Sequence, residues 1–480
     1  MFKKISLDNY KSFRHIEIDL SKTDKDPLPY AFVYGENGSG KSNLIESMMF
    51  LKDTMNTMKI INGIHKMETE IENQNAKLRS DVRRNKARNQ KIKSFSMVQE
   101  DLLDAVSELI EKIPADVMSI VEIIRMIDSA EGVSMACSFV LEGRCGNYQM
   151  RFGQDNRLIY EKLSFTVESR TQDIFELCAV EKENNEPASC GLSYKFSPNL
   201  FKNKTYGKTI TDAVQKYWGK HSFMAIMNDQ FSSNNAQYME NSLGTKIKDV
   251  IDFFNEIVVS CNYTGQSFGT GINEKIMTML KSGKIPINEK PMLLVYEKAL
   301  NSFFTRIFSD IKKVYYKTES NGRELSYVLF FSKMIGGKIR EVSIYIESTG
   351  TEKLLNLFPA FFECAKGKTV FFDEIDSGIH DILIKEVIAE VIKSFKGQFI
   401  VTTHNTSLLQ IIDPQCTFVI QTDPRGEKRI ISINKIERTQ SNNNNQNRYL
   451  NGVFDGIPII GEIDFKNIVY TAEEGFGVTK

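Results

Sequence analysis

The spacing of apolar residues predicts buried strands and amphipathic helices at both ends of the chain. Near the start, the run AFVY (31–34) is typical of a buried strand, and SNLIESMMFL (42–51) carries apolar residues at helical spacing. Near the other end, TVFF (369–372) and QFIV (398–401) are further runs of the strand type. We therefore expect an α/β fold in which the two ends of the chain come together.

The pattern changes between these ends. Residues 51–130 show little strand signal, and the apolar residues of 98–113 fall on one helical face, which predicts a helical arm inserted behind the first helix. Residues 131–200 contain β-rich runs separated by polar, glycine-containing turns, so we expect an antiparallel β subdomain. Residues 201–310 are mixed and mainly helical in pattern, and they carry no motif that we can assign.

The last third of the chain returns to strands. Asn321-Gly322 marks a hairpin between β-rich runs, and Gly336-Gly337 marks a second turn. Residues 439–447 (TQSNNNNQN) form a polar, low-complexity linker, and the apolar sequence after it suggests a docked tail. The expected organisation is therefore a head N-terminal part, a helical arm, an antiparallel β subdomain, a helical middle region, a head C-terminal part and a tail, at 1–50, 51–130, 131–200, 201–310, 311–438 and 439–480.

Composition narrows the class of protein. The chain has 480 residues, of which 41% are hydrophobic and 25% charged, and this is ordinary for a globular protein with a large core. Seven scattered cysteines without a CxxC pair suit a reducing compartment and argue against a disulfide framework or structural zinc. The N-terminal sequence turns polar at once, and no apolar run reaches the roughly 18 residues of a membrane span. We expect a cytoplasmic protein.

Charge gives a more local signal. Lysine plus arginine and aspartate plus glutamate number 61 each, so no global excess of positive charge indicates nucleic acid. Residues 77–93, however, contain eight basic side chains and a single acidic one, Asp81. This stretch is either a contact for nucleic acid or an acidic partner, or a solvated helix face, and the sequence favours neither.

The stretch FVYGENGSGKSN (32–43) carries the clearest chemistry. Its spacing, Gly35-x-x-x-x-Gly40-Lys41-Ser42, is the phosphate-binding loop pattern. Glycines let successive N–H groups point at one anion, the following helix adds its positive end, Lys41 supplies a full charge, and the Ser42 hydroxyl suits a magnesium ion. A plain tight turn is the alternative, and the strand before the loop and the helix after it argue against that.

Two adjacent carboxylates follow a second predicted strand. Asp373 and Glu374 end the run TVFFDE, and a strand would deliver both to the edge of the sheet at which α/β proteins bind ligands. We expect Asp373 to orient a magnesium ion and Glu374 to polarise the water that attacks a γ-phosphate. The motif is weak alone and becomes specific through its place after a phosphate loop.

Two further motifs complete the candidate site. His404 follows the strand QFIVTT and is placed to sense a γ-phosphate; the alternative is a histidine without a catalytic role. The segment IESTGTEKLLNLF puts Ser348 and Gly350 before an apolar helical run, which predicts a second helix N-terminus able to bind phosphate. That N-terminus suits nucleotide held by another subunit.

The order of these elements resembles the ABC-type ATPases of the RecF, SMC and Rad50 branch. The resemblance rests on KISLDNYKSF, GENGSGKS, ESTGT, VFFDEIDSGIHD and VTTHNTSLL, about a tenth of the chain. It implies an ABC-type P-loop ATPase head, with a mixed sheet, flanking helices, an antiparallel β subdomain and a helical or coiled-coil insertion. It also implies ATP and Mg²⁺ as ligands, and head-to-tail dimers in which each ATP lies between two subunits.

The resemblance assigns roles by motif. Ser42 and Asp373 would hold the metal, Glu374 would be the catalytic Walker B carboxylate, and His404 the catalytic switch residue. Ser348 and Gly350 would form the signature offered to the other subunit, although the family's usual signature is LSGGQ rather than ESTGT. No glutamine can be assigned to the family's Q-loop. The remaining nucleotide contacts would come from the phosphate loop and the D-loop: Gly35, Asn37, Gly38, Ser39, Gly40, Lys41, Ser42, Asn43, Asp376 and Ser377.

A closer resemblance concerns DEID-x-GIH, TTHN and the late RYL-x-G-x-F-x-GIP segment. These are similar to the AAA-family ATPases of bacterial anti-phage systems of the AbiL and RloA type, close to the PARIS defence ATPase and the ATPase half of the OLD nucleases. The resemblance implies an abortive-infection sensor or scaffold that oligomerises and controls a separately encoded effector, with a phage product as trigger. No TOPRIM-like carboxylate set is visible, so a TOPRIM-type nuclease would be that partner. The alternatives are a RecF-like DNA-repair ATPase, and a structural module that binds ATP without hydrolysis.

Overall fold

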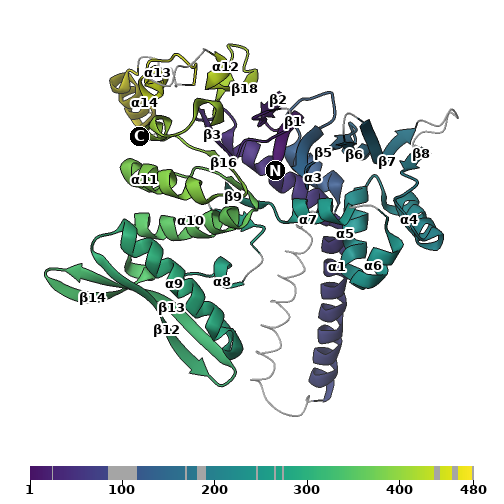
Figure 1. Ribbon diagram of the computed structural model, residues 1–480, viewed down its shortest axis with the longest axis horizontal. Coiled ribbons are helices and arrows are strands. Elements are labelled where there is room, and N and C mark those ends of the chain that lie inside the picture. Colours follow the sequence, from purple (N-terminus) through teal and green to yellow (C-terminus); the bar gives the residue numbers. More distant parts are fainter. Residues whose placement is uncertain are drawn as a thin grey trace.

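The computed structural model shows three β-sheets, with helices packed on them and one long helix leaving the body (Figure 1). The described residues are 1–23, 25–84, 116–167, 170–180, 191–244, 247–263, 266–272, 275–436, 444–456 and 463–477. Within them, no helix combines the length and the apolar character that crossing a membrane requires.

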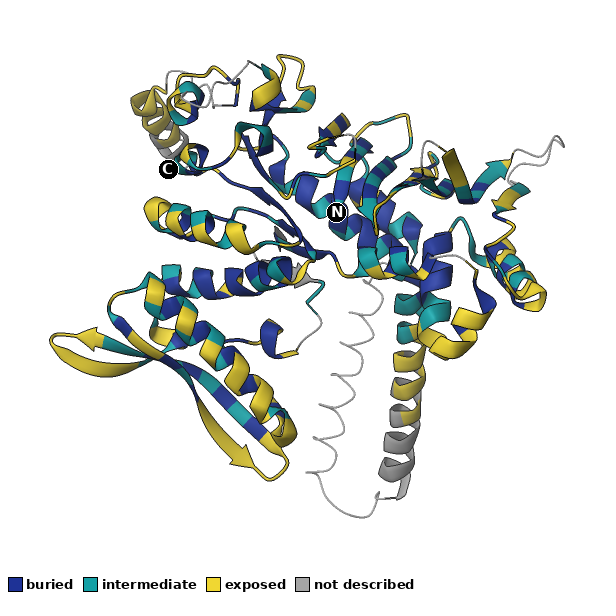
Figure 2. Cartoon of the chain, viewed as in Figure 1, coloured by how far each residue is buried: buried dark blue, intermediate teal, exposed yellow. Residues whose placement is uncertain are grey.

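A seven-stranded mixed sheet forms the centre of the molecule, in the order β10-β9-β15-β16-β3-β17-β18. Its five inner strands run parallel, and the two outer strands pair antiparallel. Parallel strands of this kind are covered on both faces, and the described residues of the inner strands are mostly buried (Figure 2). The strands are β9 (Val258–Tyr263), β15 (Thr369–Phe372), β16 (Gln398–Thr402), β3 (Tyr30–Gly35), β17 (Thr417–Thr422), β10 (Gln266–Thr270) and β18 (Lys428–Ser432).

The second sheet is antiparallel and also has seven strands, in the order β2-β1-β4-β5-β6-β7-β8. It includes the strands expected after residue 133, but it begins with β1 and β2 from the N-terminus. The buried Gln398 links it to the central sheet, because its amide donates to the carbonyls of Phe2 and Leu28 and accepts from the Phe2 N–H. The strands are β2 (Phe13–Asp19), β1 (Phe2–Tyr10), β4 (Ser134–Leu141), β5 (Arg144–Phe152), β6 (Leu158–Val167), β7 (Arg170–Val180) and β8 (Gly191–Phe196).

A smaller antiparallel sheet and the helix α9 (Lys290–Ile307) form a lobe at the lower left of Figure 1. The predicted hairpin at Asn321-Gly322 is confirmed, since it joins β12 to β13, and the turn at Gly336-Gly337 joins β13 to β14. The strands are β11 (Ser282–Pro286), β12 (Ile311–Asn321), β13 (Glu324–Ile335) and β14 (Lys338–Ser343).

The helix after the phosphate loop, α1 (Lys41–Arg84), is much longer than the sequence suggests. Leu51 and Met55 are fully buried in the core, so the boundary expected at residue 51 falls inside one continuous helix and is wrong. The helix continues out of the body, and its residues 65–67, 69, 70 and 73 are exposed (Figure 2). Residues 85–115 lie outside the described residues, and with them the middle of the predicted arm and about half of the basic stretch 77–93.

The middle region contains strands that sequence analysis missed. Residues 258–263 form β9, which lies in the central sheet beside β15. Val258, Val259 and Cys261 are buried, but the run VVSCNY also contains polar residues, so its pattern is short and ambiguous. The helices here are α3 (Val117–Ile124), α4 (Lys204–Tyr217), α5 (Phe223–Ser233), α6 (Ala236–Ser242), α7 (Ile247–Asn255) and α8 (Lys275–Thr278).

Three helices near the site complete the head, with short 3-10 turns between them. They are α10 (Thr349–Lys366), α11 (Asp381–Val391) and α12 (Ile433–Ile436). The 3-10 turns are η1 (Ile287–Glu289), η2 (Ile344–Ile346), η3 (Ile392–Ser394), η4 (Thr406–Gln410) and η5 (Pro414–Cys416).

The C-terminal tail is docked only in its first part. Tyr449 packs against Tyr34 with ring centroids 5.5 Å apart, and Phe454 is fully buried beside β17. The expected linker is shorter than predicted, because α13 (Asn445–Leu450) starts inside TQSNNNNQN. The last helix, α14 (Phe465–Gly477), is exposed along 465–472, so this part of the tail is not buried against the head.

Candidate functional site

The phosphate loop occupies the expected position between β3 and α1. Gly38 and Gly40 have φ of 80° and 102°, in the left-handed region that glycine adopts without a Cβ penalty. A Cβ on Gly40 would also lie 2.5 Å from the ring of Phe13. The Phe13 ring therefore packs directly against the loop backbone and leaves no room for a side chain at residue 40.

Lys41 is turned back into this loop. Its Nζ donates to the carbonyl oxygens of Gly35 at 2.9 Å and Glu36 at 2.8 Å, and the residue is only 5% exposed. Burial lowers the pKa of Lys41, and the charges of nearby carboxylates, Asp373 first, oppose that shift. The amine is thus held where several negative groups already stabilise its charge.

The residues present fit a phosphate and a magnesium ion. The Ser39 hydroxyl is buried in the loop and has no hydrogen-bond partner within the part of the chain that the structure describes. A buried polar atom of this kind is normally satisfied by a ligand or water. Ser42 and Asp373 supply a hydroxyl and a carboxylate, the hard oxygen donors that Mg²⁺ prefers.

The two carboxylates follow β15 at the same edge of the central sheet. Asp373 is 5% exposed, its N–H donates to the Ser260 carbonyl at 2.8 Å, and its Oδ1 accepts from the Thr402 hydroxyl at 2.5 Å. Glu374 adopts a φ of 50°, which is uncommon for a residue with a side chain. Such strain is retained only where surrounding bonds determine the backbone, and it clusters at functional sites.

The histidine follows β16, the strand between β15 and β3. Partial burial, and then the charge of Lys41, lower the pKa of His404, while Asp376, Glu374 and Asp373 raise it. The phosphate loop, the carboxylates and the histidine therefore lie within electrostatic reach of one another, although Lys41 and His404 are 363 positions apart in the chain. Parallel strand order places all three at one edge.

The D-loop and signature residues lie differently. Asp376 accepts from the Thr403 hydroxyl at 2.6 Å and from the His404 N–H at 3.3 Å, so its carboxylate bonds to the histidine segment. Ser348 caps α10 and accepts from the Thr351 N–H, and a Cβ on Gly350 would lie 3.6 Å from the Gly378 carbonyl. The signature turn therefore packs beside the D-loop of its own chain, directly after the half-buried Ser377. Among the described residues, no hydrogen bond or ion pair joins this turn to the phosphate loop.

Sequence analysis missed other groups at the loop. Lys428, from β18, donates to the Gly38 carbonyl at 2.9 Å and to the Ser12 hydroxyl at 2.8 Å. Asn43, which the sequence analysis did name, donates to the same hydroxyl at 2.8 Å. No signal in the sequence indicates Lys428, because it lies 390 positions from Gly38 in an ordinary hairpin. Thr402 and Thr403 stood in the motif TTHN, but their contacts depend on the neighbouring strand.

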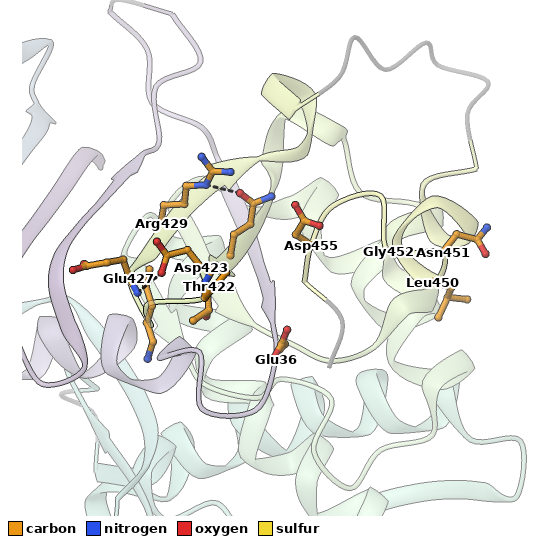
Figure 3. Close-up of a pocket in the computed structure, with 12 residues that line it drawn as sticks. Glu36, Thr422, Asp423, Glu427, Arg429, Leu450, Asn451, Gly452 and Asp455 are labelled. Atoms are coloured by element: carbon orange, nitrogen blue, oxygen red, sulfur yellow. Dashed lines mark hydrogen bonds between the residues drawn. The ribbon is translucent and has the colours of Figure 1, made fainter. Parts of the chain in front are cut away.

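A cavity of about 750 Å³ opens beside the phosphate loop (Figure 3). Glu36 lies between the β17–β18 hairpin, which contributes Asp423 and Arg429, and the tail, which contributes Asn451 and Asp455. Arg429 is held by Gln421 through a bond of 2.6 Å. The tail therefore forms one wall of the cavity beside the phosphate loop.

Comparison with known families agrees with this geometry. Residues 4–260 match a family described as "AAA domain", and residues 262–410 match one described as "AAA domain, putative AbiEii toxin, Type IV TA system". The chain belongs to the AAA domain family. Its fold is that of an ABC-type P-loop ATPase head, as expected, and AAA domains of this kind are ATPases in general terms. No curated protein matches the chain in sequence.

Solved structures similar to this AAA protein include three SMC heads. The SMC head domain from Thermotoga maritima has 14% identity and a TM-score of 0.36, covering 90% of this chain and 98% of that one. The SMC head bound to the C-winged helix domain of ScpA has 15% identity and a TM-score of 0.40, covering 91% and 99%. The third is the Smc head domain with an extended coiled coil bound to the C-terminal domain of ScpA, derived from Pyrococcus furiosus. It has 14% identity and a TM-score of 0.37, covering 90% of this chain and 97% of that one. Similarity at this level says nothing about what this chain binds.

Proposed function

We propose that this protein binds ATP with Mg²⁺ and hydrolyses it to ADP and phosphate. The observation that carries the proposal is the strand order β15-β16-β3, which collects Lys41, Asp373, Glu374 and His404 at one sheet edge. A triphosphate there would replace the Gly35 and Glu36 carbonyls as partner of Lys41. The unpartnered Ser39 hydroxyl would gain a phosphate oxygen.

Each residue then has a defined task. Ser42 and Asp373 would hold Mg²⁺, which neutralises charge on the β- and γ-phosphates when bound. Glu374 accepts a proton from the attacking water. Its backbone N–H donates a hydrogen bond of 2.8 Å to the Thr402 hydroxyl, and this bond fixes the position of the residue. His404 donates a hydrogen bond to the γ-phosphate and stabilises the charge that develops there.

A second copy of the chain would complete the site. Ser348 and Gly350 stand at the N-terminus of α10, an 18-residue helix whose positive end favours an anion. Since Ser348 is exposed and unconnected to the phosphate loop of its own chain, we assign its phosphate contact to the ATP of a partner copy. Slow, concentration-dependent turnover follows, because two subunits must close before the reaction.

The proposal is tested by phosphate release from the purified chain. Wild type should release phosphate only with Mg²⁺, and Glu374→Gln should lose at least about 100-fold of kcat while still binding ATP. Glu363→Gln is a matched control, since Glu363 is equally a glutamate, is almost fully buried and pairs with Lys368 away from the site. Unchanged turnover in Glu374→Gln would exclude this assignment of the general base.

In the cell, we propose that this ATPase is the sensor or scaffold of an anti-phage system and controls a separately encoded effector, a TOPRIM-type nuclease. The description of the family matched by residues 262–410, which names an AbiEii toxin, supports a role in such systems. Co-expression with the neighbouring gene should protect cells from phage, and Lys41→Ala should abolish protection. Protection that survives Lys41→Ala would contradict the proposal.

A second candidate is a RecF-like ATPase that binds DNA directly. It is favoured by the basic residues at the far end of α1, among them Arg79, Arg83 and Arg84, which lie on a helix that projects from the head. Binding of duplex DNA that weakens with salt and disappears when these three arginines become glutamines would support it. Equal binding by wild type and the triple variant would rule out this contact.

A further inference from the structure

Two consecutive threonines at the end of β16 reach the carboxylates that follow β15. Thr402 and Thr403 are both fully buried. The Thr402 hydroxyl donates to Asp373 Oδ1 at 2.5 Å and accepts from the Glu374 N–H at 2.8 Å. One hydroxyl thus fixes a carboxylate oxygen of Asp373 and the backbone of Glu374, the residue with positive φ.

Thr403 makes a parallel set of bonds one residue later. Its hydroxyl donates to Asp376 Oδ1 at 2.6 Å and accepts from the Asn405 N–H at 3.0 Å. Asp376 in turn accepts from the backbone N–H of His404 at 3.3 Å. The histidine is therefore held by a carboxylate from the neighbouring strand's loop, and Thr403 holds that carboxylate.

These bonds have different consequences for the site. A carboxylate that uses one oxygen in a buried hydrogen bond cannot rotate freely, so its second oxygen is presented in one direction. For Asp373 this means that the metal-facing oxygen is oriented before any ligand arrives. For His404 the bonds fix the main chain from which the ring extends. Adjacent strands therefore set both groups in one rigid unit.

We propose that Thr402 and Thr403 are positioning residues of the ATPase reaction, and this inference rests on the proposed function. Thr402 orients Asp373 and Glu374 for metal and water, and Thr403 orients His404 through Asp376. A role confined to stability would predict the same effect for any buried threonine of the sheet. Thr417 in β17 provides that comparison, because it is fully buried and its hydroxyl donates to the Asp413 carbonyl at 3.1 Å.

The test compares Thr402→Val, Thr402→Ser and Thr417→Val. Valine keeps the shape and removes the hydroxyl, while serine keeps the hydroxyl. The first readout is Mn²⁺ affinity, measured by electron paramagnetic resonance with a non-hydrolysable ATP analogue. Thr402→Val should weaken it by about 10- to 100-fold, the usual loss for an outer-shell partner of a metal ligand. Thr402→Ser should restore it, and Thr417→Val should leave it unchanged.

The second readout separates the two threonines. Thr403→Val should lower kcat by about 10-fold while KM and Mn²⁺ affinity stay near wild type, because its hydroxyl acts on the His404 main chain through Asp376. Thr402→Val should lower both kcat and Mn²⁺ affinity. If Thr402→Val does not fold, Thr402→Ala replaces it, with Thr417→Ala as control.

Two results would overturn the inference: Mn²⁺ affinity and kcat of Thr402→Val equal to wild type, or the same losses in Thr417→Val. Failure of the proposed function gives a different pattern. In that case wild type binds Mn²⁺ with the analogue and releases no phosphate, while Thr402→Val still weakens Mn²⁺ binding.

Discussion

The edge of the central sheet and the signature turn are built in opposite ways. At the sheet edge, Lys41 and Asp373 are each 5% exposed, and their side chains bond to residues at the ends of β3 and β16. At the turn, Ser348 is exposed, and its bonds among the described residues go to Glu347, Thr351 and Glu352 of its own segment. One half of the candidate site is therefore fixed by buried hydrogen bonds, while the other half is presented outward.

Variants of the two regions should therefore fail in different ways. A change at the sheet edge alters groups within one subunit and should act at any protein concentration. A change at the turn should act only through assembly. Four predictions follow from this difference, beginning with the largest effect.

The first concerns the amine at the sheet edge. Lys41→Ala should lower kcat/KM for ATP by about 10³-fold, because a buried, preorganised charge at a phosphate is lost. Lys428→Ala, which removes the second lysine that touches this loop, should cost no more than about 10-fold, since Lys428 is more exposed and binds Gly38 from outside. Steady-state kinetics with increasing ATP measures both. Equal losses would show that the loop does not distinguish its two lysines.

The second concerns the turn. Ser348→Arg should lower turnover by about 100-fold, since it places a bulky side chain at the α10 N-terminus, and leave ATP affinity near wild type. An equimolar mixture of Ser348→Arg and Lys41→Ala should then regain about a quarter of wild-type activity, because half of the dimers hold one intact site. A mixture that stays inactive would mean that the turn and the loop do not meet across two copies.

The third tests the fit of the loop against the β1–β2 turn. Gly40→Ala should destabilise the protein by about 2 kcal/mol and weaken ATP binding, because it combines positive φ with a contact of 2.5 Å to Phe13. Gly38→Ala is the control, since its φ is also positive but nothing lies within 4 Å of the added Cβ. Urea unfolding should show the smaller loss in Gly38→Ala. Equal losses of stability in Gly40→Ala and Gly38→Ala would show that the contact with Phe13 does not restrict residue 40.

The fourth, with the smallest effect, lies inside α1. Burial raises the pKa of Asp53 to about 6, against 3.8 for the ordinary group. A raised folded-state pKa contributes stability below pH 3.8 that is lost as pH rises through 6. Asp53→Asn should therefore raise the free energy of unfolding by about 2 kcal/mol at pH 7 and change it little at pH 4. Denaturation at both pH values checks this, and a gain that does not depend on pH would contradict it.

Much of the site follows from sequence because its motifs sit at strand ends. A phosphate loop, an apolar run ending in Asp373 and Glu374, and another ending before His404 can be placed at one sheet edge from strand order alone. The roles of these residues remain predictions, which the variants above are designed to test. The local sequence pattern indicated which runs are buried strands and which polar side chains follow each of them.

The groups that sequence analysis missed depend on pairing between distant segments. Lys428 reaches the phosphate loop because β18 pairs with β17, which in turn pairs with β3. No local feature of the sequence indicates that Lys428 has this contact. Strand β9 was missed because its six residues mix apolar and polar types, although Val258, Val259 and Cys261 are buried. The end of the first helix was placed too early because polar residues after Leu51 suggested a new segment, whereas a helix leaving the body changes composition without ending.

That continuous helix has a mechanical consequence. α1 starts at the lysine assigned to the phosphates and runs for 44 residues, about 66 Å at 1.5 Å per residue. A tilt of about 5° at its buried end therefore sweeps the far end through about 6 Å. The nucleotide would sit at the fulcrum of a lever, so that a displacement too small to disturb the head becomes large enough at the tip to engage or release another molecule.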